Sequence, residues 1–157
     1  MATLHLMVGL PGSGKTTEAR KLEQEYHALR LTTDEWHIRL FGNDFHDEGD
    51  NDEHNRRHSR IEELLWETAE KLLRLDVDVI LDFGCWAKVE REELREKARK
   101  AGAGFRIHYM ACSKEELWKR LEERNRTVGE SAVFRISKKH LETWYRQFEA
   151  PTPEELL

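Results

Sequence analysis

The sequence predicts an α/β fold in which parallel strands alternate with amphipathic helices. Short apolar runs alternate with segments in which apolar side chains recur every three or four positions, the spacing of one helix face. The run at residues 77–83 is almost continuously apolar, which is typical of a parallel strand covered on both faces. The alternation indicates βαβ units, whose functional groups gather beyond the carboxyl ends of the strands.

The first half of the chain supplies two strands and two helices. We expect a strand at residues 3–8, then a glycine-rich turn and a helix that starts at Lys15. A second strand at 28–33 leads into a short helix over 34–42, which a glycine closes. Residues 43–58 are polar, acidic and rich in histidine, and they offer almost nothing to bury. We therefore expect a mobile loop or the edge of a cap there.

The second half of the chain continues the alternation, so that about four strands are expected in all. The same signals predict, in order, a long helix with an apolar stripe from Ile61 to Leu73, a strand at 77–83, a charged helix over 88–102, a strand at 105–112, a helix opened by the capping box of Ser113 and Glu116, and a last helix capped by Ser137.

Length and composition limit the class of protein. The 157 residues suffice for one domain, which we place at residues 1–157. No apolar run approaches the ~20 residues that a membrane span requires, and the N-terminus has no basic leader, so we expect a cytoplasmic protein with no membrane partner. Cys85 and Cys112 are then expected to be free thiols. The net charge of −5 gives no general attraction to polyanions.

The turn after the first strand carries the strongest chemical signal. It fits the Walker A pattern G-x-x-x-x-G-K-[ST] and lies between a strand and a helix. Glycines let the backbone aim its N–H groups at phosphate oxygens, and the helix adds its positive end. The lysine reaches the β- and γ-phosphates, and the threonine hydroxyl can bind Mg²⁺. The predicted nucleotide contacts in this loop are Gly9, Leu10, Pro11, Gly12, Ser13, Gly14, Lys15, Thr16 and Thr17.

Asp34 follows the second strand, and its position supports two interpretations equally. It could be a carboxylate near the γ-phosphate that orients and deprotonates an acceptor hydroxyl. It could instead be the N-cap of the helix that begins here, because aspartate is favoured at that position. Arg39, five residues further on, could bind an anionic group of the substrate or pair with the acidic loop.

Asp82 ends the third strand in the run VILDFG. An acid at the end of a buried apolar strand can reach Mg²⁺ through water or hold the acceptor, although solvated aspartates are also common at strand ends. No glutamate follows Asp82, so the usual water-activating acid of mechanical ATPases is absent from this position.

Two arginines lie one turn apart on the helix after the fourth strand, at Arg120 and Arg124. Phosphoryl transfer gains most from positive charge placed on the migrating group. The alternative is a solvated basic face that pairs with Glu116, Glu122 and Glu123.

The segment at 43–58 raises the question of a metal site, because it holds His46, His54 and His58 among several aspartates. The spacing fits neither an EF-hand nor a zinc site. His54 and His58 would share a helical face, but a solvated acidic loop accounts for the composition better.

Taken together, these segments resemble the small P-loop kinase family that holds polynucleotide 5′-kinases, zeta toxins and chloramphenicol phosphotransferase, whose single-domain members are often described as AAA family ATPases. The resemblance covers most of the chain and rests on GLPGSGKTT, TTDEWHIRLFG, VILDFGCWAKVER, LWKRLEERN and FEAPTPEEL. It implies a three-layer P-loop NTPase fold like that of nucleoside monophosphate kinases. The expected sheet order is 2-3-1-4, with helices on both faces and a helical lid at about 118–136.

The resemblance also implies roles for residues around the acceptor. Asp34 corresponds to the general base of the family and Arg39 to a substrate contact. Asp82 corresponds to the residue that places the acceptor, with Arg91 a further candidate in the same segment.

The lid and the cofactors follow from the same resemblance. Arg120 and Arg124 correspond to lid residues near adenine and the phosphates. ATP and Mg²⁺ are the implied cofactors, with Thr16 and Asp82 as metal ligands. The implied catalytic residues are Asp34, Lys15 and Arg124.

We therefore expect an ATP- and Mg²⁺-dependent phosphotransferase that moves the γ-phosphoryl group to a hydroxyl of a small molecule. The acidic residues at 43–53 argue against a nucleic-acid acceptor without excluding it. A polynucleotide 5′-hydroxyl kinase is the first alternative, and a nucleotide-dependent switch or slow ATPase is the second. The sequence leaves the identity of the acceptor and the oligomeric state open. The basic residues near Asp34 that a polynucleotide could use are Arg39, Arg56, Arg57 and Arg60.

Overall fold

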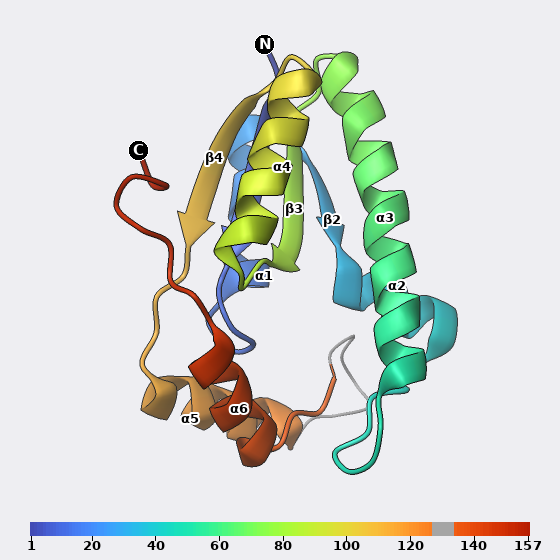
Figure 1. Cartoon of the computed structure of the whole chain (residues 1–157), viewed down its shortest axis with the longest axis vertical. Helices are drawn as coiled ribbons and strands as arrows, with labels where there is room; N and C mark the ends of the chain where they lie inside the picture. Colours follow the sequence, from blue (N-terminus) through green and yellow to red (C-terminus); the bar gives the residue numbers. More distant parts are fainter. Residues whose placement is uncertain (127–133) are drawn as a thin grey trace.

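The computed structural model describes residues 1–126 and 134–157, and its helices and strands follow the expected order (Figure 1). Its four strands are all parallel and lie in the order β2-β3-β1-β4, which confirms the predicted sheet. The strands are β1 (Thr3–Val8), β2 (Leu29–Thr32), β3 (Val79–Gly84) and β4 (Gly104–Tyr109).

Helices cover both faces of the sheet, so the predicted three layers are confirmed (Figure 1). Helix α1 (Lys15–Tyr26) packs Ala19 and Leu22 against Met7 and Ile80 on one face. On the other face lie α3 (Asp52–Arg74) and α4 (Lys88–Lys100). Side chains alternate between the two faces of a strand, so neighbouring residues of β1 enter different layers. The larger cluster includes Leu4, Leu6, Val8, Ile61, Leu65, Ala69, Leu81, Leu94 and Ala98.

Three helices surround the carboxyl ends of the strands: α2 (Thr33–Phe41), α5 (Lys114–Asn125) and α6 (Lys138–Gln147). In Figure 1, α5 and α6 lie below the sheet, at the end to which the strand arrows point. Both helices have the predicted caps, because Ser113 Oγ accepts the N–H of Glu116 and Ser137 Oγ accepts the N–H of His140. They share an apolar cluster formed by Leu10, Leu117, Leu121, Ile136 and Leu141.

The mobile loop expected at 43–58 is wrong over its second half, because α3 begins at Asp52. The segment also buries more than its polarity suggests. The ring of Phe45 lies 5.2 Å from that of His54 and 5.7 Å from that of Trp144. A polar segment can be buried when its side chains satisfy one another, and a hydropathy pattern does not register this.

The predicted lid is described only in part. Residues 118–125 belong to α5, as expected for a lid helix, whereas residues 127–133 lie outside the described residues. None of the described helices combines the length and apolar character that crossing a membrane would require.

Arg91 has a different environment from the acceptor contact that the resemblance suggested. Its side chain is 1% exposed, and it donates hydrogen bonds to both carboxylate oxygens of Glu155, at 2.8 and 3.3 Å. A third bond, at 2.9 Å, goes to the carbonyl oxygen of Cys85. The hydrogen bond from Arg91 also lowers the pKa of Glu155. The pair thus ties the C-terminal segment to the connection between β3 and α4.

Glu155→Ala is expected to lower the free energy of unfolding by about 3–5 kcal/mol, because it leaves the buried guanidinium of Arg91 without its carboxylate. Urea denaturation measures the loss. Glu154→Ala, at the exposed neighbouring position, is the matched control and should change stability little. Equal effects of the two substitutions would contradict a stabilising role for this pair.

Candidate functional site

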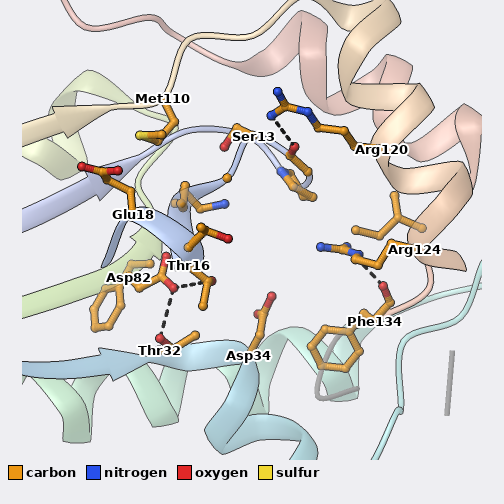
Figure 2. A pocket seen from close by; sticks show the side chains of 18 of the residues that line it. Ser13, Thr16, Glu18, Thr32, Asp34, Asp82, Met110, Arg120, Arg124 and Phe134 are labelled. Atoms are coloured by element: carbon orange, nitrogen blue, oxygen red, sulfur yellow. Dashed lines mark hydrogen bonds between the residues drawn. The ribbon is translucent and has the colours of Figure 1, made fainter. Parts of the chain in front are cut away.

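A pocket of about 1020 Å³ lies beyond the carboxyl ends of the strands, lined by the glycine-rich loop and by parts of α1, α2 and α5 (Figure 2). Three predicted site residues do not line the pocket. Gly9 and Leu10, at the start of the loop, are buried, and Arg39 is exposed on α2. The predicted site residues that do line it are Pro11, Gly12, Ser13, Gly14, Lys15, Thr16, Thr17, Asp34, Asp82, Arg120 and Arg124.

The glycine-rich loop has a backbone that its sequence makes possible. Gly12 and Gly14 have φ angles of 86° and 94°, in the left-handed region that glycine adopts readily. Helix α1 starts directly after Gly14, so the unpaired N–H groups of its first turn and its positive dipole end lie at the loop. The Lys15 ammonium donates to the carbonyl oxygen of Leu10 at 3.3 Å. Burial lowers the pKa of Lys15, and the charges of Asp82 and Asp34 oppose that shift.

Asp82 lies within β3 and is 5% exposed, so the interpretation of a solvated strand end is wrong. Its Oδ2 accepts hydrogen bonds from the hydroxyls of Thr16, at 2.7 Å, and Thr32, at 3.1 Å (Figure 2). Its Oδ1 is buried and has no hydrogen-bond partner within residues 1–126 and 134–157. A buried carboxylate oxygen needs a donor or a cation. Hydroxyl and carboxylate oxygens are ligands that Mg²⁺ prefers, so these residues fit the implied metal ion.

Asp34 lies in the first turn of α2 and does not cap it, because the N-cap is Thr32. The capping interpretation of Asp34 is therefore wrong. The side chain is 53% exposed and points into the pocket, with its Oδ1 3.9 Å from His58 Nε2 (Figure 2). Arg124 extends from α5 toward the same space. Burial lowers the pKa of Arg124 and the charge of Asp34 opposes this, so the two groups interact electrostatically across the pocket.

The two arginines of α5 are anchored at different points of the pocket. Arg120 donates to the carbonyl oxygen of Gly12 at 3.3 Å and to Glu116 at 3.2 Å. Of these two bonds, only the one to Glu116 is what a solvated basic helix face would make. Arg124 donates to the carbonyl oxygen of Phe134 at 3.4 Å. Both guanidinium groups thus belong to the pocket wall, as expected for the lid helix (Figure 2).

An aromatic wall, formed by Phe45, Trp86, Phe134 and Trp144, lines another part of the pocket. Its rings are contiguous: the Trp86 and Trp144 centroids are 5.4 Å apart, and Phe45 is 5.7 Å from Trp144 and 6.5 Å from Phe134. The sequence did not indicate this wall, because its members come from four separate segments. Aromatic spacing along the chain carries no signal for such a grouping.

The family model that describes an AAA domain matches residues 4–151. No curated protein matches the sequence. The solved structures that are similar to the chain include the following three. A chain of the Pnkp1/Rnl/Hen1 RNA repair complex is 24% identical, with a TM-score of 0.74; the similarity covers 93% of this chain and only 43% of that one. Kti12 from Chaetomium thermophilum, in complex with ADP-AlF3, is 20% identical, with a TM-score of 0.70 and coverage of 96% and 82%.

The third structure is a gluconokinase from Sinorhizobium meliloti 1021, which is 18% identical, with a TM-score of 0.60 and coverage of 98% of this chain and 77% of that one. At these identities the similarities establish the fold, which is that of P-loop kinases.

Proposed function

The chain belongs to the AAA domain family, and from this premise and its kinase-like fold we propose that it transfers the γ-phosphoryl group of ATP to a hydroxyl group of a small molecule. The position of Asp34 supports the proposal most. Its carboxylate points into the pocket, is not used to cap α2, and lies across from the guanidinium of Arg124. This pairing of a base with a positive charge is what hydroxyl phosphorylation requires.

Five polar side chains of the pocket have a task in the proposed reaction. Lys15 binds the β- and γ-phosphates, and Thr16 and Asp82 would hold Mg²⁺, which would neutralise phosphate charge. Asp34 orients the acceptor hydroxyl and accepts its proton as the oxygen attacks phosphorus. Arg124 offsets charge on the migrating group. Closure of α5 over the pocket excludes water, so that ATP is not hydrolysed in the absence of an acceptor.

The aromatic wall favours an uncharged acceptor with an apolar or planar face. Aromatic rings bind such faces by stacking and apolar contact. A polynucleotide would need a basic track for its phosphates, but the candidates Arg39, Arg56, Arg57 and Arg60 do not line the pocket. Within the described part of the chain, the lysines and arginines that line the pocket belong to the glycine-rich loop, α1 and α5. They are Lys15, Arg20, Lys21, Arg120 and Arg124.

ADP release measured across nucleosides, sugars, aminoglycosides and oligonucleotides tests the proposal. A small neutral acceptor should stimulate release, and Trp86→Leu should raise the KM for that acceptor about threefold to tenfold with little change in the KM for ATP, the scale of one aromatic contact. Release that no acceptor stimulates would favour the slow ATPase or switch. Stimulation by oligonucleotides alone, with strongly salt-dependent binding, would favour the polynucleotide kinase.

A further inference from the structure

Three histidines meet beside the pocket, although they are far apart in the sequence. His37 comes from α2, and His54 and His58 come from the first turns of α3. One ring nitrogen from each lies within 4.8 Å of the other two. His37 Nδ1 and His58 Nδ1 are 3.3 Å apart, and His37 is fully buried. The sequence pattern groups His54 and His58 with His46 and gives no sign of His37, the residue that completes the cluster.

Asp44 fixes the protons of two of these rings. Its Oδ1 accepts hydrogen bonds from His37 Nε2 at 2.7 Å and from His54 Nδ1 at 2.6 Å, and Arg57 donates to its Oδ2 at 3.0 Å. Because a carboxylate that also accepts a bond from Arg57 serves as an acceptor, the ring nitrogens that face Asp44 carry the protons. His37 Nδ1 and His54 Nε2 are left with lone pairs.

The surroundings of the three rings favour a bound metal ion. His37 and His54 are buried, at 0% and 8% exposed. Phe134 packs edge-on against both of these rings, with ring centroids 5.3 and 4.9 Å away, so the cluster has an apolar cover. Imidazole rings with a carboxylate behind two of them and an apolar cover form the surroundings of histidine-bound metal ions in proteins.

We propose that His37 Nδ1, His54 Nε2 and His58 Nδ1 bind a divalent transition-metal ion, with Zn²⁺ the ion that fits best. Two nitrogens bound tetrahedrally to zinc at about 2.0–2.1 Å lie about 3.3–3.4 Å apart, and the two Nδ1 atoms are already 3.3 Å apart. Side-chain rotation brings in the third nitrogen, and a fourth position is left for water. Mg²⁺ prefers oxygen ligands, so this site is separate from the one at Asp82.

The ion would join α2 to α3 next to the proposed base. A metal ion on His58 Nδ1 leaves the proton of that ring on Nε2, the atom that lies 3.9 Å from Asp34 and 4.0 Å from Glu62. Metal binding would thus fix the orientation of the ring beside Asp34. The binding itself does not depend on the proposed kinase activity.

Titration of the chelator-treated protein with ZnCl₂, followed by calorimetry and by thermal unfolding, tests the site. Wild type should bind a single Zn²⁺ tightly, keep it in excess Mg²⁺, and unfold at a higher temperature when it is bound. His54→Asn keeps a nitrogen at the Nδ1 position for Asp44 and removes the ligand Nε2. His37→Gln likewise keeps the donor at the Nε2 position and removes the ligand Nδ1. Each should weaken Zn²⁺ binding at least about tenfold.

His46→Gln is the matched control, because His46 is exposed on the same segment and lies outside the cluster. It should bind Zn²⁺ as wild type does. Thermal unfolding in the presence of chelator shows whether each variant is folded before binding is compared. Wild type that binds no Zn²⁺, or His54→Asn and His37→Gln that both bind it with wild-type affinity, would overturn the proposal. In that case the His37–His58 contact of 3.3 Å is an ordinary hydrogen bond.

Discussion

Asp34→Asn is expected to lower the rate of phosphoryl transfer by about 10²-fold or more, the usual contribution of a general base. The substitution keeps the shape of the side chain and removes its basicity. ATP affinity should change little, because the glycine-rich loop and Lys15 are untouched. The free energy of unfolding should fall only slightly, since Asp34 is half exposed, does not cap α2, and has a long contact of 3.9 Å with His58.

Loss of a negative charge in the first turn of a helix lowers stability by about 0.3–1 kcal/mol by itself. Asp52→Asn measures this effect separately, because Asp52 is exposed in the first turn of α3 and does not line the pocket. Melting temperature, nucleotide affinity and transfer rate should be measured on one preparation of each variant. Transfer that Asp34→Asn retains with a true acceptor would remove Asp34 from the mechanism and leave Asp82 as the next candidate.

Local pattern was sufficient to predict the alternation of strands and helices, the phosphate loop, and the caps at Ser113 and Ser137. The strand order, by contrast, was expected from the resemblance to the kinase family, and the sheet confirms it. The two central strands, β1 and β3, also have the apolar character that burial on both faces requires. Local and global preferences agree in these elements, which is why sequence reasoning succeeds there.

Sequence reasoning failed where long-range contacts decide the structure. His54 is buried against Asp44 and His37, contacts that local periodicity does not register, and α3 begins at Asp52 within a run of polar residues. The start of α2 was expected at Asp34 and lies one residue earlier, at Thr33. Thr32 is the N-cap by its backbone, while its hydroxyl bonds to Asp82 and not to the helix. Arg91 carries no local sign that its partner is Glu155, 64 positions away.

Asp82→Asn is expected to reduce Mg²⁺-dependent turnover by on the order of 10²-fold or more, the scale seen when one preorganised charge-stabilising group is lost. The amide can still accept hydrogen bonds from Thr16 and Thr32, so the loop should keep its geometry. The uncharged amide cannot, however, neutralise the charge of a divalent cation. The nucleotide-free protein should be about as stable as wild type. The variant removes a buried charged oxygen that lacks a donor, but it also removes the charge that favours the protonated form of Lys15.

This pairing of lower turnover with undiminished stability separates a metal ligand from a structural residue. A structural Asp82 would give the opposite result, a lower melting temperature and normal kinetics in the folded fraction. Asp76→Asn is the matched control, because Asp76 is exposed in the turn before β3 and has a φ of 63°, which asparagine tolerates. Turnover should be titrated with Mg²⁺ at saturating ATP. A rate that returns to the wild-type value at high Mg²⁺ would mean that Asp82 only raises the affinity for the metal ion. A rate that stays low at every Mg²⁺ concentration would mean that the carboxylate also stabilises the transition state for transfer.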